Sequence, residues 1–162
     1  MTTELGIHFD PGQHKFAVVV SRYNREITEK LRRGAMQTLT DSGVLGDRVL
    51  IAPVPGAWEL AVTTSLLIDR PDDPFSAIIC LGAVIKGETT HDEHINRSIC
   101  TELNRLACDY SIPVSLGLLT CNSYAQAEDR AGGAVGNKGI EAARAAIEMV
   151  AMIDSLSSQT SD

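Results

Sequence analysis

The feature that most constrains this chain is a regular alternation of two hydrophobic patterns. Continuous apolar runs occupy residues 16–21, 48–54, 75–84 and 113–120, and segments with apolar residues three and four apart stand between them. A continuous run of this length is typical of a strand buried on both faces. Strands that alternate with helices form a parallel sheet through right-handed crossovers. The sequence therefore predicts an α/β fold, a three-layer αβα sandwich around a four-stranded parallel sheet.

The helical segments between the strands have recognisable ends. The first carries apolar residues four apart over 27–39 and ends at Gly43, and the second runs from about 57 to 69. Thr90 and Glu93 have capping-box spacing in front of a third helix.

The last third of the chain begins with another capping box. Ser123 and Gln126 open a short helix that reaches about Arg130. A glycine-rich link over 131–139 then leads to a final helix that carries its apolar residues over 140–150.

The whole chain, 1–162, is expected to form a single domain. Residues 1–14 contain an apolar segment, LGIHF (5–9), which a turn cuts off from the rest. We expect this segment to be an extra strand, added to the sheet of a neighbouring subunit. The polar end, 155–162, is expected to be a frayed tail.

Charge and composition exclude several classes of function. The net charge is −7 and the pI is near 5.0, so a nucleic acid or an acidic membrane surface would be repelled. No apolar run is long enough to cross a membrane, and the N-terminus does not resemble a secretory signal. The four cysteines form no CxxC pair, which favours reduced thiols in a cytoplasmic protein.

Ligands of such sheets bind beyond the carboxyl ends of the strands. That rule selects four loops, at residues 21–24, 54–59, 81–91 and 119–123. Two of the chain's few aromatic residues, Tyr23 and the single tryptophan, Trp58, fall in them. They indicate either a stacking surface for a flat ring or ordinary helix–sheet packing near the rim.

The third loop ends in GETTH, which leads into a helix. The glycine Gly87, the free N–H groups of the helix start and the Thr89 and Thr90 hydroxyls could bind a phosphate, or the threonines could simply cap the helix. His91 stands at the first helical position, where the positive helix end favours a neutral ring that can accept a proton. It is therefore a candidate general acid/base.

Other charged residues allow weaker interpretations. His91 and His94 are three apart, but without a third ligand at a recognised spacing they do not indicate a metal site. Arg130 and Lys138 could reach an anion from another element, or Arg130 could pair with its own helix end.

Taken together, these loops resemble the lumazine synthase family, which has a flavodoxin-like fold. The resemblance rests on VVVSRYN, VPGAWEL, ICLGAVIKGETTHDEHI, PVSLGLLT and the pairing of QAEDRAGG with GNKGIEAA, from residue 16 to about 150. It implies condensation of 5-amino-6-(D-ribitylamino)uracil with 3,4-dihydroxy-2-butanone 4-phosphate to 6,7-dimethyl-8-ribityllumazine. Phosphate and water are released in this penultimate step of riboflavin biosynthesis, and no metal or organic cofactor is implied.

The resemblance also implies roles for individual residues. His91 would transfer protons, and Glu88, Thr89 and Arg130 would bind the butanone phosphate. The pyrimidine and its ribityl chain would contact Tyr23, Ala57, Trp58, Glu59, Ala83, Val84, Ile85 and Leu116. Asn24, Lys138 and Glu141 would support the site.

Departures from the family pattern fall at Leu116, usually a phenylalanine from the neighbouring subunit, at Ala134, often a lysine, and at His94, usually aromatic. The resemblance further implies a homopentamer with each site at a subunit interface. Some members assemble pentamers into icosahedral shells, and the uninterrupted RAGGAVGNKG is compatible with that.

Overall fold

The structure, a computed structural model that describes residues 5–89 and 91–159, is built around the predicted parallel sheet. Its strands are β1 (Phe16–Ser21), β2 (Val49–Val54), β3 (Ala77–Ile85) and β4 (Val114–Cys121). They lie in the order β2-β1-β3-β4, so β1 and β3 are central and β2 and β4 form the edges. Every residue of β1 is buried, as its continuous apolar run predicts.

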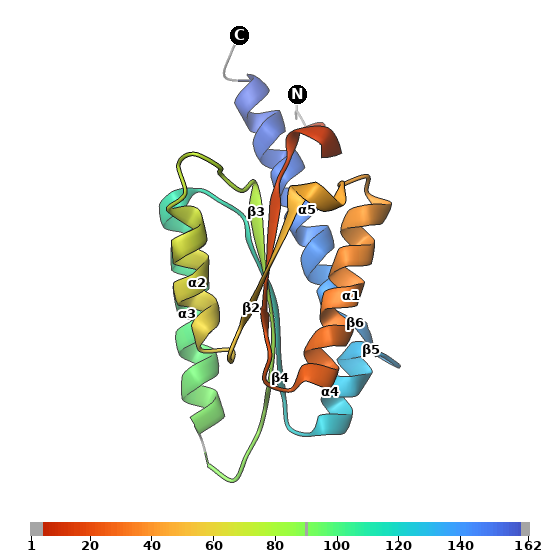
Figure 1. Ribbon diagram of the computed structural model, residues 1–162, viewed down its shortest axis with the longest axis vertical. Helices are drawn as coiled ribbons and strands as arrows, with labels where there is room; N and C mark the ends of the chain where they lie inside the picture. The colour runs from red at the N-terminus through yellow and green to blue at the C-terminus, as the bar shows by residue number, and fades with distance from the viewer. Residues whose placement is uncertain (1–4, 90, 160–162) are drawn as a thin grey trace, which may run out of the picture.

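Helices cover both faces of the sheet, which confirms the three-layer α/β architecture (Figure 1). On one face lie α2 (Glu59–Ile68) and α3 (His91–Tyr110). On the other lie α1 (Arg25–Asp41), α4 (Tyr124–Arg130) and α5 (Lys138–Gln159). The predicted apolar stripe of α1 is buried, and Gly43 follows that helix with a φ of 88°, a conformation that favours glycine.

The sheet separates two apolar clusters. Alternate side chains of β1 point to opposite faces, so Val18 packs with α1 and α5, whereas Val19 packs with α2 and α3. Leu31 is among the fully buried residues of the first cluster, and Leu60 is among those of the second. The carboxyl ends of the four parallel strands lie together at one end of the molecule.

One local expectation is wrong, because the stretch 155–159, expected to fray, continues α5. Residues 5–9 form no strand within the single chain, so their pairing with a neighbouring subunit stays a prediction. The glycine-rich link contains a short hairpin that was not predicted, in which β5 (Ala131–Gly133) pairs antiparallel with β6 (Gly136–Asn137). The expected cap Thr90 lies outside the described residues, so its pairing with Glu93 stays a prediction.

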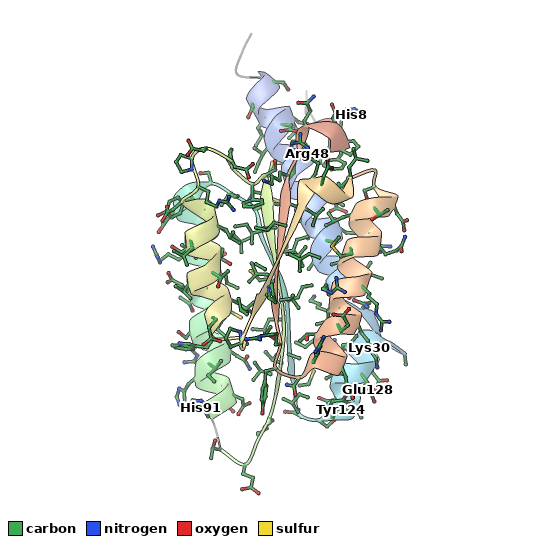
Figure 2. All side chains as sticks on the ribbon, viewed as in Figure 1. His8, Lys30, Arg48, His91, Tyr124 and Glu128 are labelled. Atoms are coloured by element: carbon green, nitrogen blue, oxygen red, sulfur yellow. The ribbon has the colours of Figure 1, made fainter. Side chains whose placement is uncertain are left out.

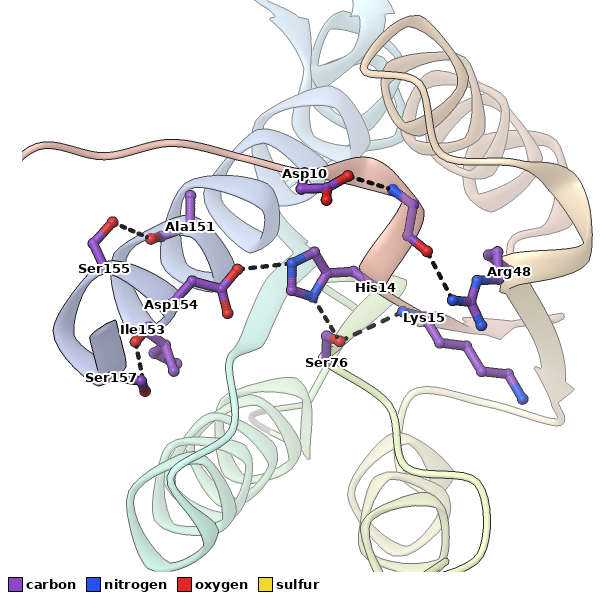
Figure 3. Close-up of polar contacts among 11 residues, drawn as sticks. Asp10, His14, Lys15, Arg48, Ser76, Ala151, Ile153, Asp154, Ser155 and Ser157 are labelled. Atoms are coloured by element: carbon purple, nitrogen blue, oxygen red, sulfur yellow. Dashed lines mark hydrogen bonds and ion pairs between the residues drawn. The ribbon is translucent and has the colours of Figure 1, made fainter. Parts of the chain in front are cut away.

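The N-terminal segment is fastened at His14 (Figure 3). Its Nδ1 lies 3.0 Å from Ser76 Oγ, and its Nε2 lies 2.8 Å from Asp154 Oδ2 on α5. The Phe9 ring stacks on the imidazole with a centroid separation of 5.5 Å. This buried histidine therefore joins the chain start, β3 and α5 at the end of the sheet opposite the free strand ends.

Asn137 fastens the start of α5. Its Oδ1 accepts hydrogen bonds from the N–H groups of Gly139 and Ile140, at 2.8 and 3.3 Å. Its Nδ2 donates to the carbonyls of Lys30 on α1 and Ala131 on β5, at 3.1 and 3.3 Å. One side chain thus caps α5 and ties it to two other elements.

Within residues 5–89 and 91–159, none of the helices combines the length and the apolar character that a membrane crossing requires.

Candidate active site

A cavity of about 340 Å³ opens at the carboxyl ends of β1 and β3, between the starts of α2 and α3. This is the edge at which ligands of parallel sheets bind. It is lined by Tyr23, Gly56, Ala57, Trp58, Ala83, Val84, Ile85, Gly87, Thr89, His91, Asp92 and Ile95. The structure therefore brings together eight of the predicted site residues, from three of the four loops chosen from the sequence.

Tyr23 stands at the rim because the loop after β1 is held on both sides. Its backbone N–H donates to the Pro55 carbonyl at 3.1 Å. The next residue, Asn24, has a left-handed backbone with a φ of 55°, and its Nδ2 donates to the Ala83 carbonyl at 2.9 Å. The loop is thereby tied to β2 and β3, while the Tyr23 side chain remains 73% exposed.

The loop after β2 is closed by Glu59. Its Oε2 accepts a hydrogen bond from the Gly56 N–H at 2.8 Å, which fixes the turn that carries Ala57 and Trp58. Trp58 lines the cavity and is 59% exposed, so neither Trp58 nor Tyr23 is buried within the single chain. Of the two interpretations of these aromatics, the geometry favours a surface for a flat ring.

His91 is the first residue of α3 and faces the cavity. Figure 2 shows it at the lower end of α3. Its backbone N–H points to Thr89 Oγ1 at 3.5 Å, the limit of a hydrogen bond. Thr89 and Gly87 line the same cavity, so the imidazole that is the candidate acid/base lies beside the loop predicted to bind an anion.

The remaining predicted residues do not line this cavity. Glu88 is exposed on the loop before α3, and Leu116 is 40% exposed on the edge strand β4. Lys138 and Glu141 pair with one another at 2.8 Å, at the start of α5. Arg130 ends α4, on the α1 and α5 side of the sheet.

Arg130 lies close enough to Cys121 to influence the pKa of its thiol. Burial raises the pKa of the Cys121 thiol, and the nearby Arg130 guanidinium acts against that rise. Cys121 belongs to the apolar cluster between the sheet and α1 and α5. Arg130 and His91 therefore lie at the same end of the sheet, near the carboxyl ends of its strands, but on opposite faces.

Two cavity residues, Asp92 and Ile95, lie outside the loops that the sequence selected. Ile95 stands four residues after His91, a spacing that brings both side chains to one face of a helix. That spacing was available in the sequence. For Asp92 the sequence contained no comparable signal, because adjacent helical residues ordinarily point in different directions.

Among the described residues, no three His, Cys, Asp or Glu side chains gather closely enough to hold a metal ion. The arrangement instead offers an apolar slot, two exposed aromatic rings, a glycine–threonine loop and one imidazole. It suits a flat heterocycle next to a small polar molecule.

Comparison with known proteins agrees with this geometry. A sequence model of the 6,7-dimethyl-8-ribityllumazine synthase family matches residues 13–154. The protein of that name from Rhodopirellula baltica is 47% identical over 136 residues, which cover 84% of this chain and 86% of the relative. Its namesake from Xylella fastidiosa (strain 9a5c) is 42% identical over 147 residues, covering 90% and 94%. One from Coxiella burnetii (strain RSA 493 / Nine Mile phase I) is 39% identical over 139 residues, covering 86% and 91%. The chain belongs to the 6,7-dimethyl-8-ribityllumazine synthase family.

Proposed function

We propose that this protein condenses 5-amino-6-(D-ribitylamino)uracil with 3,4-dihydroxy-2-butanone 4-phosphate. The products are 6,7-dimethyl-8-ribityllumazine, phosphate and water. The observation that carries the proposal is the cavity itself, which His91 lines together with Gly87 and Thr89 and with the aromatic residues Tyr23 and Trp58.

The pyrimidine ring would occupy the apolar part of the cavity. Tyr23 and Trp58 would contact its face, and the backbone of residues 83–85 would bind its polar edge. The ribityl chain would lie toward Ala57 and Glu59. Because one oxygen of Glu59 already accepts the Gly56 N–H, its role would include holding the loop that the ribityl chain contacts.

The chemistry would depend on proximity and on proton transfer. The pyrimidine amine attacks the ketone to form an imine with loss of one water, and elimination of phosphate leaves an enol that tautomerises to a second ketone. The ribityl-bearing nitrogen attacks that ketone, and a second water is lost as the ring closes. His91 would move protons in these steps. Both substrates are reactive, so much of the acceleration would come from holding them together in one cavity.

We further propose that a second copy of the chain completes each site. Arg130 ends α4 on one face of the sheet, whereas His91 begins α3 on the other, and this arrangement supports a site that takes the two residues from different subunits. Arg130, Leu116, Lys138 and Glu141 would instead serve the cavity of a neighbouring subunit, with Glu88 and Thr89 of that neighbour at the phosphate. The proposed assembly is a homopentamer in the cytoplasm, and a sizing measurement would separate it from a shell of pentamers.

The direct test of the activity mixes the two substrates with the purified protein. Lumazine formation is followed by its absorbance, and phosphate release is measured in the same reaction. One phosphate per lumazine, dependent on both substrates, is expected. A protein that binds lumazine but forms none would be a binding module and would refute the proposal.

The shared site has its own test, which combines two impaired variants. In a ring with head-to-tail interfaces, a His91→Ala subunit beside an Arg130→Ala subunit rebuilds one intact site, and random mixing would restore about a quarter of the sites. Recovered activity on co-assembly is therefore expected. Mixtures no more active than the separate variants would show that both residues act within one chain.

The N-terminal segment provides a test of assembly. We propose that residues 5–9 add a strand to the sheet of a neighbouring subunit. Deleting residues 1–12 should then yield smaller species with proportionally lower activity, measured by light scattering and a rate assay. Full assembly size after the deletion would show that the segment stays on its own subunit, where Phe9 packs on His14.

A further inference from the structure

Arg130 ends α4, a helix of only seven residues. A helix this short gains little stability from its own hydrogen bonds, so contacts with other elements must hold it. Ala127 is the only buried residue of α4, and the contact of one methyl group with the core does little to fix the rotation of the helix about its axis. Arg130 forms no ion pair within the part of the chain that the structure describes, so the position of its guanidinium follows that of α4.

Two polar contacts with α1 supply the missing constraint. The Tyr124 hydroxyl donates to Glu26 Oε2 at 2.6 Å. One turn further along both helices, Lys30 Nζ donates to Glu128 Oε1 at 3.1 Å. The two α1 residues are four apart, and so are the two α4 residues, so each pair lies on one face of its helix. The contacts therefore join the same two faces, and Figure 2 shows Lys30, Glu128 and Tyr124 gathered where α1 meets α4.

The hydroxyl contact is maintained at neutral pH. The hydrogen bond to the Glu26 carboxylate raises the pKa of the Tyr124 hydroxyl to about 12, so the hydroxyl keeps its proton and remains a donor. Both contacts with α1 are exposed, and exposed contacts of this kind contribute little to global stability. Their effect should therefore be seen in the orientation of α4 rather than in the stability of the fold.

We propose that Tyr124 and Lys30 are positioning residues for the butanone phosphate. By holding α4 against α1, they set the point from which the Arg130 guanidinium reaches the phosphate in the cavity of the neighbouring subunit. A guanidinium contact depends on the direction of its N–H donors, so a rotated helix weakens the phosphate contact and leaves aminouracil binding unchanged. This inference rests on the proposed function, because it takes Arg130 to bind the phosphate.

The test measures the KM for each substrate. Tyr124→Phe removes the hydroxyl, Lys30→Met removes the charge, and both substitutions keep most of the apolar surface of the side chain. Each should raise the KM for the butanone phosphate about twofold, and the double variant should raise it about fivefold, which is the size typical of exposed polar contacts. The KM for the aminouracil and the midpoint of urea unfolding should stay at their wild-type values.

The decisive measurement repeats the double variant in an Arg130→Ala background. If Tyr124 and Lys30 act through Arg130, the KM for the butanone phosphate should not rise further there, because no guanidinium is left to position. A general loosening of α4 and the hairpin after it would instead raise this KM by the same factor in both backgrounds.

A matched control is available on α3. Tyr110 is the last residue of that helix, at the end opposite His91, and it is 50% exposed. Tyr110→Phe removes the same hydroxyl from an exposed tyrosine and should leave the KM for both substrates unchanged.

Three results would overturn the inference. The first is an unchanged KM for the butanone phosphate in the double variant. The second is an equal rise in the KM for both substrates. The third is an equal effect of the double variant with and without Arg130. Failure of the proposed function would be seen separately, as wild-type protein that forms no lumazine from the two substrates.

Discussion

Replacing Asn137 with aspartate should destabilise this protein, although aspartate caps helices as well as asparagine does. The Oδ1 cap on the N–H groups of Gly139 and Ile140 is kept, and the helix dipole favours the new charge by about 0.5 kcal/mol. The Nδ2 bonds to the Lys30 and Ala131 carbonyls are lost, at about 1 kcal/mol each. The new carboxylate oxygen then faces those carbonyls, which adds about 1–3 kcal/mol of unfavourable interaction. The net loss of stability should be about 2.5–4.5 kcal/mol at pH 7.

Equilibrium unfolding in urea measures this difference, at one protein concentration because assembly makes stability concentration-dependent. Asn104→Asp is the matched control, since Asn104 is exposed on α3 and the same exchange there should change stability by less than about 0.5 kcal/mol. If Asn137→Asp unfolds at the wild-type urea concentration, the Nδ2 contacts do not hold α5 to α1 and β5.

The other predictions concern the proposed site and the thiols. His91→Ala should slow lumazine formation by about 100-fold or less, because the amine–ketone condensation is intrinsically facile, and an unchanged single-turnover rate would remove His91 from the mechanism. Arg130→Ala should weaken binding of the butanone phosphate by about 1.5–3 kcal/mol, with little effect on binding of the aminouracil, and Arg130→Lys should recover part of the loss. Steady-state KM values for each substrate measure this, and equal losses for both would mean that Arg130 supports the fold. In native protein at pH 8, Cys108 is exposed and should react quickly with a thiol reagent. Cys80 should react only on unfolding, because it is buried and burial raises its pKa to about 12. A fast phase of the native protein that disappears in Cys80→Ser would contradict this.

The sequence alone determined the α/β class, the parallel sheet and the end of the sheet at which the candidate cavity lies. The central strand β1 and most of β3 are buried on both faces, so their composition is continuous and apolar. The face of α1 that carries Leu31 follows the helical period directly. The loops of Tyr23, Trp58 and His91 could be chosen because the carboxyl ends of parallel strands meet at one edge.

Tertiary structure decided which residues share the cavity and which lie on the other face. In the sequence, His91 begins the helix that follows β3 and Arg130 ends the helix that follows β4. Whether the helix after a strand covers one face of the sheet or the other depends on packing between distant segments. The same holds for the polar contacts of Asn137, since the partners of a side chain come from other elements. Local patterns specify the helices and strands and their buried faces. The distances between chemical groups on different elements are set by the whole core, in which α2 and α3 pack on one face of the sheet and α1, α4 and α5 on the other.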